Sequence, residues 1–260
     1  MRIRSCGQIL AVLAAYAIAP GAAVAASLTD HHQHLFSPEA LSVFSAPRPV
    51  TGENLIAEMD AAGIDRAVIL STAYGFSNPF RNPGSDEYAH VQADNDWTSM
   101  QVARYPGRLT GFCAVNPLRD YALREIERCS KDANLRTGLK LHFGNSDVNL
   151  DIEEHVRRVS AVFAAANARG MAIVVHAHAN IDHKRPYGAK EARVFLQALL
   201  PAAPGVTIQI AHMAGGGVYD QAVDEALGVY AQAIGRGDPA SGMFISTRPS
   251  WECRKRAPRS

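Results

Sequence analysis

Residues 172–177 read Ala172-Ile-Val-Val-His-Ala177, a short apolar run that closes on a histidine. Strands buried on both faces of a parallel sheet are almost wholly apolar, and this run has the length and composition of such a strand. Comparable runs occur elsewhere in the chain, at 27–34, 66–72, 109–115, 138–143 and 206–212. These six segments are predicted to be strands of one parallel sheet.

Amphipathic segments separate the predicted strands. Residues 55–62 place apolar side chains on one helical face before Gly63, and residues 156–166 do the same ahead of Gly170. Alternating strands and helices are typical of α/β proteins with a parallel sheet. A length of 260 residues suits one barrel better than two small domains. The predicted fold class is therefore α/β, a TIM-like (β/α) barrel over residues 27–246.

The C-terminal end of the chain is predicted to leave this barrel incomplete. Residues 242–246 could begin a seventh strand, but residues 247–260 have no apolar periodicity and are expected to be an irregular basic tail. Because a TIM barrel has eight βα units, about seven of the eight are expected here. Truncation or a shifted reading frame is the favoured explanation, and a flexible tail on an intact protein is the alternative.

The N-terminus has the features of a secretory signal peptide, assigned to residues 1–26. Arg2 and Arg4 precede an apolar run at 9–19, and Ala23-Val-Ala25 fits a cleavage site. The run is much shorter than the roughly 20 residues needed to span a bilayer. We therefore expect an exported protein, periplasmic or secreted, with no stable membrane insertion after signal removal. The formal net charge of +1 gives no reason to expect binding to nucleic acid.

The four cysteines show no paired spacing, so neither a structural zinc cluster nor a disulfide framework is predicted. An oxidising compartment would permit Cys113 to pair with Cys129. Cys113 is expected in a strand and Cys129 in a helix, which argues against that pairing.

The strongest local signal for chemistry is Asp30-His-His-Gln-His34, at the end of the first predicted strand. Strand side chains alternate, so Asp30, His32 and His34 should share one face and His31 the other. Two imidazoles at the C-terminal mouth of a barrel can hold one metal ion, since each offers a nitrogen lone pair in a fixed direction. The alternative is a pair of surface histidines near the mature N-terminus.

Later strands also end in candidate functional residues. His176 and His212 each close an apolar run, at the strand end where barrel active sites assemble. Lys140 and His142 share one face, so Lys140 should lie one layer beneath a His142 that points into the mouth. Lys140 could be a charge partner, a contact for a substrate anion, a metal bridge if carbamylated, or simply a paired interior cation.

The remaining histidines are weaker candidates. His178 shares the parity of His176 and could contact a substrate or belong to a loop. The other histidines lack both the strand-end position and the inward parity, and are expected at the surface or in packing; these are His31, His90, His155 and His183. Residues 76–87 are rich in Asn, Pro, Gly and Ser, and are predicted to be a loop that helps to shape a substrate pocket.

Taken together, these motifs resemble the amidohydrolase-related group of the metal-dependent hydrolase superfamily, from about residue 28 to about residue 242. The motifs are Asp30-x-His32-x-His34, Gly138-Leu-Lys140-Leu-His142, His176 and Ala211-His212-Met-Ala-Gly215. The resemblance implies a TIM-like barrel with one or two divalent metals, often zinc. It matches His32 and His34 to the first-strand ligands, and His176 and His212 to the fifth- and sixth-strand histidines.

Members of this group hydrolyse amides, esters or lactones, and some relatives decarboxylate aromatic or related acids. They also use an aspartate at the end of the eighth strand as ligand and general base, to which no residue of this sequence can be matched. We therefore expect a metal-dependent hydrolase that acts on a small carbonyl substrate through metal-activated water. His212, Lys140 and His142 are its catalytic candidates.

Two alternatives to this hydrolase stay open. One is a metal-dependent decarboxylase of a small carboxylic acid, with Lys140 or Arg81 seating the acid. The other is a non-catalytic truncated product that lacks the last-strand aspartate. The sequence does not indicate an oligomeric state.

Overall fold

A computed structural model of the chain describes residues 27–81, 86–178, 187–215, 220–236 and 243–245. The predicted signal peptide, the basic tail at 247–260 and His183 lie outside these residues. Within the described ranges, no helix combines the length and the apolar character that crossing a membrane requires.

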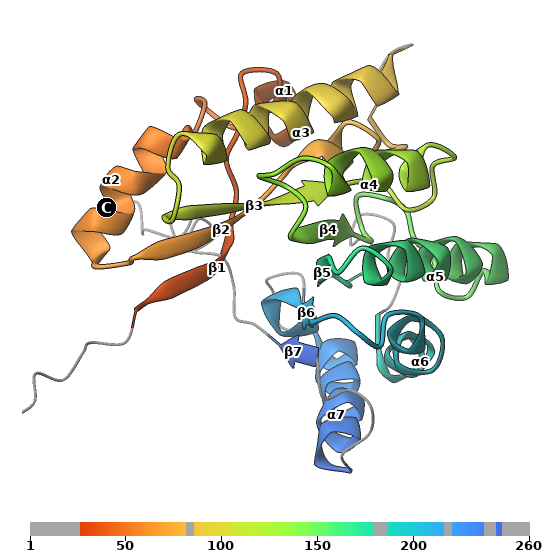
Figure 1. The fold of residues 1–260 in the computed structure, drawn as a ribbon. Helices are drawn as coiled ribbons and strands as arrows, with labels where there is room; N and C mark the ends of the chain where they lie inside the picture. Colours follow the sequence, from red (N-terminus) through yellow and green to blue (C-terminus); the bar gives the residue numbers. More distant parts are fainter. Residues whose placement is uncertain (1–26, 82–85, 179–186, 216–219, 237–242, 246–260) are drawn as a thin grey trace, which may run out of the picture.

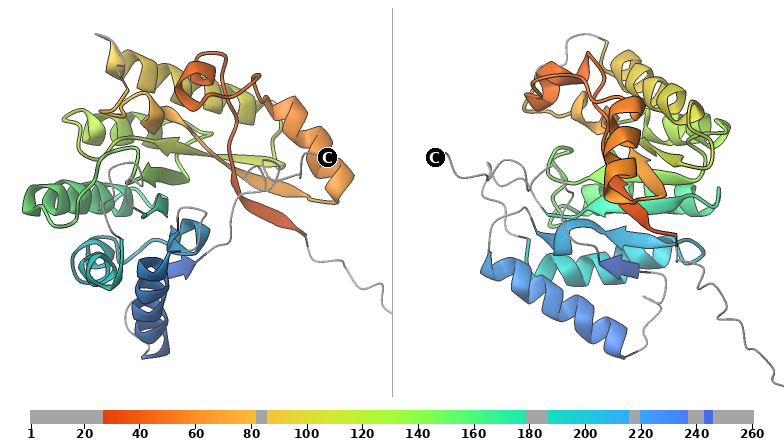
Figure 2. Two further views of the ribbon diagram at one scale, coloured as in Figure 1. Left: turned by 180° about the vertical axis from the view of Figure 1, so that it is seen from behind. Right: turned by 90° about the vertical axis from the view of Figure 1, so that its left-hand side faces the viewer.

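Seven parallel strands form one sheet, in which they follow each other in sequence order (Figure 1). The sheet curls, and the longer helices lie on its outer side (Figure 2). The predicted fold, an incomplete TIM-like barrel, is thus confirmed. The strands are β1 (Thr29–Gln33), β2 (Arg66–Leu70), β3 (Leu109–Ala114), β4 (Gly138–His142), β5 (Ala172–His176), β6 (Ile208–Ile210) and β7 (Met243–Ile245).

Helices connect successive strands, and two of them end where the sequence predicts. Gly63 and Gly170 both adopt positive φ, 68° and 66°, just beyond α2 and α5, as expected of residues that end helices. The helices are α1 (Ala40–Phe44), α2 (Gly52–Ala62), η1 (Ala73–Gly75), α3 (Glu87–Ala103), α4 (Ala122–Ser130), α5 (Glu153–Asn167), α6 (Ala189–Val194), η3 (Phe195–Leu199), η4 (Leu200–Ala202), η5 (Ala211–Ala214) and α7 (Gln221–Gly235).

Strand alternation separates an outer core from an inner layer. The odd-numbered side chains of β4 and β5 join the large core beneath the helices. The even-numbered Val174 belongs to a separate inner cluster with Leu70, Phe112 and Ala211. In the register of β4 and β5, Lys140 lies beside Val174, and His142 beside His176. Lys140 therefore lies one layer beneath His142, as the sequence predicts.

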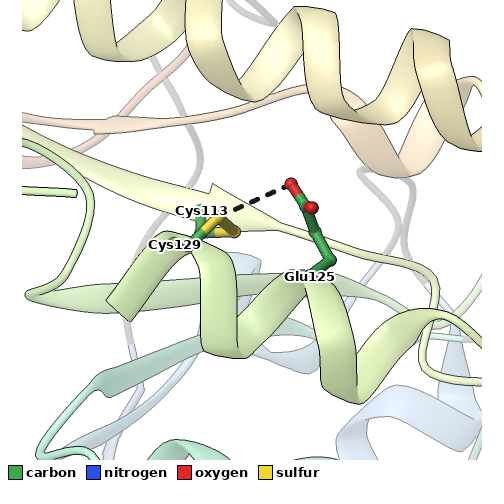
Figure 3. Close-up of side chains that lie close together, drawn as sticks. All are labelled: Cys113, Glu125 and Cys129. Carbon is green, nitrogen blue, oxygen red and sulfur yellow. Dashed lines mark hydrogen bonds between the residues drawn. A yellow bond between two sulfur atoms is a disulfide. The ribbon is translucent and has the colours of Figure 1, made fainter. Parts of the chain in front are cut away.

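A disulfide joins Cys113 of β3 to Cys129 of α4, which corrects the expectation that these cysteines stay apart (Figure 3). A strand and the helix that follows it pack face to face in a βα unit, so the two Cα atoms come within 6.1 Å. That separation is normal for a disulfide. Glu125 Oε1 lies 3.7 Å from Cys129 Sγ. This is a packing contact, because a disulfide sulfur has no proton to donate.

We expect this disulfide to contribute substantially to stability. It closes a loop with a sequence separation of 16, and cross-linking a loop of that size is worth about 3 kcal/mol through the entropy of the unfolded chain. Replacing both Cys113 and Cys129 by alanine should lower the free energy of unfolding in urea by about that amount. Reductant should weaken the wild-type protein and leave the double variant unaffected; an unchanged wild-type midpoint after verified reduction would contradict this role.

Candidate functional site

Five histidine rings gather at the C-terminal ends of the strands, among them all four predicted metal ligands. The ring centroid of His32 lies 5.2 Å from that of His34 and 4.6 Å from that of His212. The His176 ring lies 5.0 Å from that of His212, and it stacks on His142 at 3.9 Å. His32, His34 and His212 are buried, whereas His142 and His176 are partly exposed at the mouth.

The hydrogen bonds of these rings fix which nitrogens can act as ligands. His34 Nδ1 lies 2.7 Å from the Leu70 carbonyl oxygen. Because a carbonyl only accepts, Nδ1 carries the proton, and Nε2 of the neutral ring keeps its lone pair. Such a bond from the distal nitrogen commonly orients metal-binding histidines. His32 Nδ1 is buried without a hydrogen-bond partner among the described residues.

His142 has the opposite tautomer. Its Nδ1 accepts a hydrogen bond of 3.1 Å from the backbone N–H of Asn145. Nε2 of the neutral ring must then carry the proton. His142 is therefore built to donate a hydrogen bond, whereas His34 is built to offer a lone pair.

Burial favours the neutral form of four histidines in the cluster, His32, His34, His142 and His176. It lowers the pKa of His34 to about 3, with a further contribution from the Lys140 cation. Burial is also the main cause that lowers the pKa of His32, His142 and His176 well below the usual value. Neutral imidazole is the form that binds a metal ion, so the site is prepared for one without prior loss of protons.

Lys140 lies inside this cluster. Its side chain is buried, 1% exposed, and its Nζ lies 3.3 Å from His32 Nε2. An amine at that distance can donate to the imidazole lone pair. The sequence-based placement of Lys140 under the mouth is thus confirmed, and the structure adds its contact with the first-strand histidine.

A strained turn aims His212 into the cluster. His212, Met213 and Ala214 have φ values of 59°, 53° and 59°, a left-handed conformation that costs a non-glycine residue on the order of 1 kcal/mol. The turn directly follows β6 and holds His212 in contact with His32 and His176. Backbone strain of this kind is concentrated at functional sites.

Tyr74 is a site residue that the sequence analysis misses. It lies in η1, directly after β2, and its ring centroid is 4.9 Å from that of His142 and 6.5 Å from that of His34. Its side chain is buried, 4% exposed. The sequence signal was weak because one tyrosine after a strand has no distinguishing motif.

A buried carboxylate on α3 holds the segment that carries Tyr74. Asp94 accepts hydrogen bonds from the hydroxyls of Ser37 (2.9 Å), Ser71 (3.3 Å) and Thr72 (2.9 Å), and from the Thr72 backbone N–H (3.2 Å). These bonds tie the segments that follow β1 and β2 to one anchor. Burial nevertheless raises the pKa of Asp94 above its usual value.

The weaker candidates lie outside the ring cluster. His31 is exposed, His90 is 43% exposed, and His155 Nδ1 accepts from the backbone of Asn149, which confirms their surface and packing positions. The exposed Arg81 guanidinium lies over the Phe44 ring, 5.5 Å from its centroid. His178 is buried, with Nε2 3.6 Å from Asp220 Oδ2.

A cavity of about 440 Å³ opens beside β1, between α1 and α2. Its lining includes Asp30, Gln33, His34, Phe36, Phe44 and Arg48. None of residues 76–81, from the loop predicted to shape a pocket, lines it. Part of that loop is instead packed inward, where Asn78 donates a hydrogen bond of 2.8 Å to Asn145 Oδ1.

The arrangement of the rings fits a metal ion. Imidazoles on a tetrahedral ion, with metal to nitrogen distances of about 2 Å, place their ring centroids about 5 Å apart. The separations among His32, His34, His212 and His176 are close to this value. Among the described residues, however, only Cys113, Glu125 and Cys129 bring three ligand-type atoms within 4.8 Å. That trio holds the disulfide, and the histidine nitrogens of the cluster, as they stand, are spaced more widely than this.

Comparisons with known proteins agree with this fold. The chain is similar in structure to a 5-carboxyvanillate decarboxylase from Sphingomonas paucimobilis, with a TM-score of 0.56 and 21% identity over 85% of this chain and 80% of the other. A second such decarboxylase, from Novosphingobium aromaticivorans, has bound manganese and 3-methoxy-4-hydroxy-5-nitrobenzoic acid. Its TM-score is 0.58, with 17% identity over 85% of this chain and 75% of the other. A third similar structure is that of an Acinetobacter baumannii protein described as a probable 2-pyrone-4,6-dicarboxylic acid hydrolase. Its TM-score is 0.50, with 13% identity over 89% of this chain and 88% of the other.

Sequence comparison identifies the family. None of the curated proteins matches the chain significantly. The sequence model described as amidohydrolase matches residues 29–237, a range that includes six of the seven strands and every histidine of the cluster. The chain therefore belongs to the amidohydrolase family.

Proposed function

We propose that this protein is a metal-dependent hydrolase that acts on a small amide, ester or lactone bearing a carboxylate. The observation that carries the proposal is the convergence of the His32, His34, His176 and His212 rings at the C-terminal ends of the strands. The manganese in a structural relative supports a divalent ion as the cofactor, and zinc is our choice for a site of imidazole nitrogens.

Each residue would have a distinct task. His32 in β1, His34 directly after β1 and His176 in β5 would hold the ion, and His34 is already oriented by the Leu70 carbonyl. His212 would complete the ligand set or polarise the substrate carbonyl. When bound, the ion supplies Lewis acidity and activates water for attack on that carbonyl. His142 would donate its Nε2 proton in a hydrogen bond to a substrate oxygen.

Decarboxylation is the second candidate, because Lys140 supports it specifically. Its amino group lies within the cluster, 3.3 Å from His32, where it could contact the carboxylate of an acid. Arg81 gives less support, since it is exposed and its guanidinium lies over the Phe44 ring rather than among the histidines.

Product analysis separates the two reactions. The purified protein, loaded with zinc or with manganese, would be incubated with aromatic acids and with carboxylate-bearing lactones and esters. Hydrolysis should release one new acid per turnover without carbon dioxide. Stoichiometric carbon dioxide from an aromatic acid would instead establish decarboxylation. Absence of both reactions, with the ion fully bound, would favour the non-catalytic reading of this chain.

We also propose that the protein is exported after removal of residues 1–26. The features of that segment support export, and so does the Cys113–Cys129 disulfide, because such bonds persist in oxidising compartments. Fractionation of cells that express the full chain should recover the mature protein outside the cytoplasm, starting near residue 27. A cytoplasmic protein that keeps residues 1–26 would contradict this proposal.

A further inference from the structure

Tyr74 lies between the cavity and the histidine cluster. On one side its ring contacts Phe44, which lines the cavity, at a centroid distance of 5.9 Å. On the other side it packs against His142 at 4.9 Å. His34 belongs to both groups, since it lines the cavity and is a proposed ligand. A molecule that extends from the cavity to the cluster would therefore pass Tyr74.

The hydroxyl of this tyrosine has no side-chain partner in the described part of the chain. Buried tyrosines normally pair their hydroxyl group, yet Tyr74, only 4% exposed, makes no side-chain hydrogen bond to any described residue. Its neighbour His142 presents an Nε2 proton because Asn145 occupies Nδ1. The Tyr74 and His142 rings, each of which carries a neutral donor, thus pack against each other, and Lys140 lies one layer beneath His142.

The backbone around Tyr74 is fixed. Asp94 binds both the hydroxyl and the backbone N–H of Thr72, and the Ser71 hydroxyl as well. At the next residue, Gly75, an added Cβ would come within 2.2 Å of the Phe44 ring. Donors held rigidly in place bind an anionic oxygen well, since little entropy is lost on binding.

We propose that the Tyr74 hydroxyl, together with His142 Nε2–H, binds the carboxylate of the substrate and thereby selects for acids. Neutral donors suit this task beside buried Lys140, because they add hydrogen bonds without adding positive charge to a site that would also hold a metal ion. The proposal deepens the proposed function, on which it rests, by naming the group that recognises the substrate carboxylate.

The test is ligand binding by the manganese-loaded protein, with 3-methoxy-4-hydroxy-5-nitrobenzoic acid as the probe. Its nitrophenol absorbs visible light, so its dissociation constant can be measured without turnover. Tyr74→Phe removes only the hydroxyl and should weaken binding about tenfold or more, as expected for a hydrogen bond to a charged group. Tyr105→Phe is the matched control, since that ring packs beside α2, away from the cluster, and it should bind like wild type.

Metal content and thermal melting of each variant separate the possible failures. If Tyr74→Phe keeps its manganese and binds the acid within about twofold of wild type, the role of Tyr74 is wrong and the proposed function stands. The same conclusion follows if wild type keeps its manganese and does not bind the acid at millimolar concentration. If wild type binds no divalent ion, the proposed function fails, and the inference fails with it.

Discussion

Replacing His32 and His34 by alanine is expected to abolish stoichiometric binding of a divalent metal. Both rings belong to the buried cluster, and His34 Nε2 keeps a lone pair because Nδ1 is bonded to the Leu70 carbonyl. Mutation of a residue that merely hydrogen-bonds to a metal ligand typically lowers metal affinity about 10–100-fold. Loss of two ligands should therefore lower it by more than about a hundredfold. Bound zinc, measured by plasma emission after dialysis, should fall to the level of the buffer, and activity should fall with it.

The double variant His31→Ala/His90→Ala is the matched control for this loss. It removes two imidazoles of the same chain that lie away from the cluster, the exposed His31 and the half-buried His90. Its zinc content should equal that of wild type. Circular dichroism should show both double variants folded, and a folded His32→Ala/His34→Ala protein that keeps stoichiometric zinc would exclude the proposed ligands.

Acid is expected to destabilise the metal-free protein strongly. The folded-state pKa of His34 is lowered to about 3 by burial, whereas the unfolded chain titrates near 6.5. Between these values the unfolded state binds a proton that the folded state does not, so stability falls as the pH falls through this window. The loss is about 1.4 kcal/mol per pH unit for each such histidine. His34 alone should therefore cost about 2 kcal/mol between pH 6.5 and pH 5.

Urea unfolding in the presence of a chelator, at pH 7.5 and at pH 5.0, measures this effect. His34→Asn is the informative variant, because the asparagine amide can replace the Nδ1 hydrogen bond to Leu70 without titrating. Its stability should depend less steeply on pH than that of wild type. Equal pH dependence of the two proteins would mean that His34 titrates normally, and the account of the buried neutral cluster would then be wrong for that residue.

Much of the architecture could be predicted because the repeats of apolar residues in helices and in strands are local properties of the chain. Apolar runs gave the strands, and residues before Gly63 and Gly170 gave two helix ends. The period of two along a strand was enough to place Lys140 beneath His142. The register of β4 and β5 then brings His142 against His176, in accord with the expectation that strand-end side chains meet at one rim.

The position of Tyr74, the turn at His212 and the disulfide could not be predicted from the sequence, because they depend on contacts between segments that pack together only in the fold. Tyr74 lies beside the cluster in a turn whose Thr72 is hydrogen-bonded to Asp94, a residue of the helix that follows. The left-handed turn at His212 has no glycine to reveal it. The sequence places Cys113 in a strand and Cys129 in a helix, and only the packing of α4 on β3 brings the two together.

X-ray absorption spectroscopy of the zinc-loaded protein tests the central claim most directly. The claim is that histidines from separate strands bind one divalent ion at the open ends of the sheet. We predict at least three imidazole ligands per zinc, visible as outer-shell scattering, with zinc to nitrogen distances of about 2.0–2.1 Å. A spectrum of oxygen ligands without imidazole scattering, or one dominated by sulfur, would contradict it.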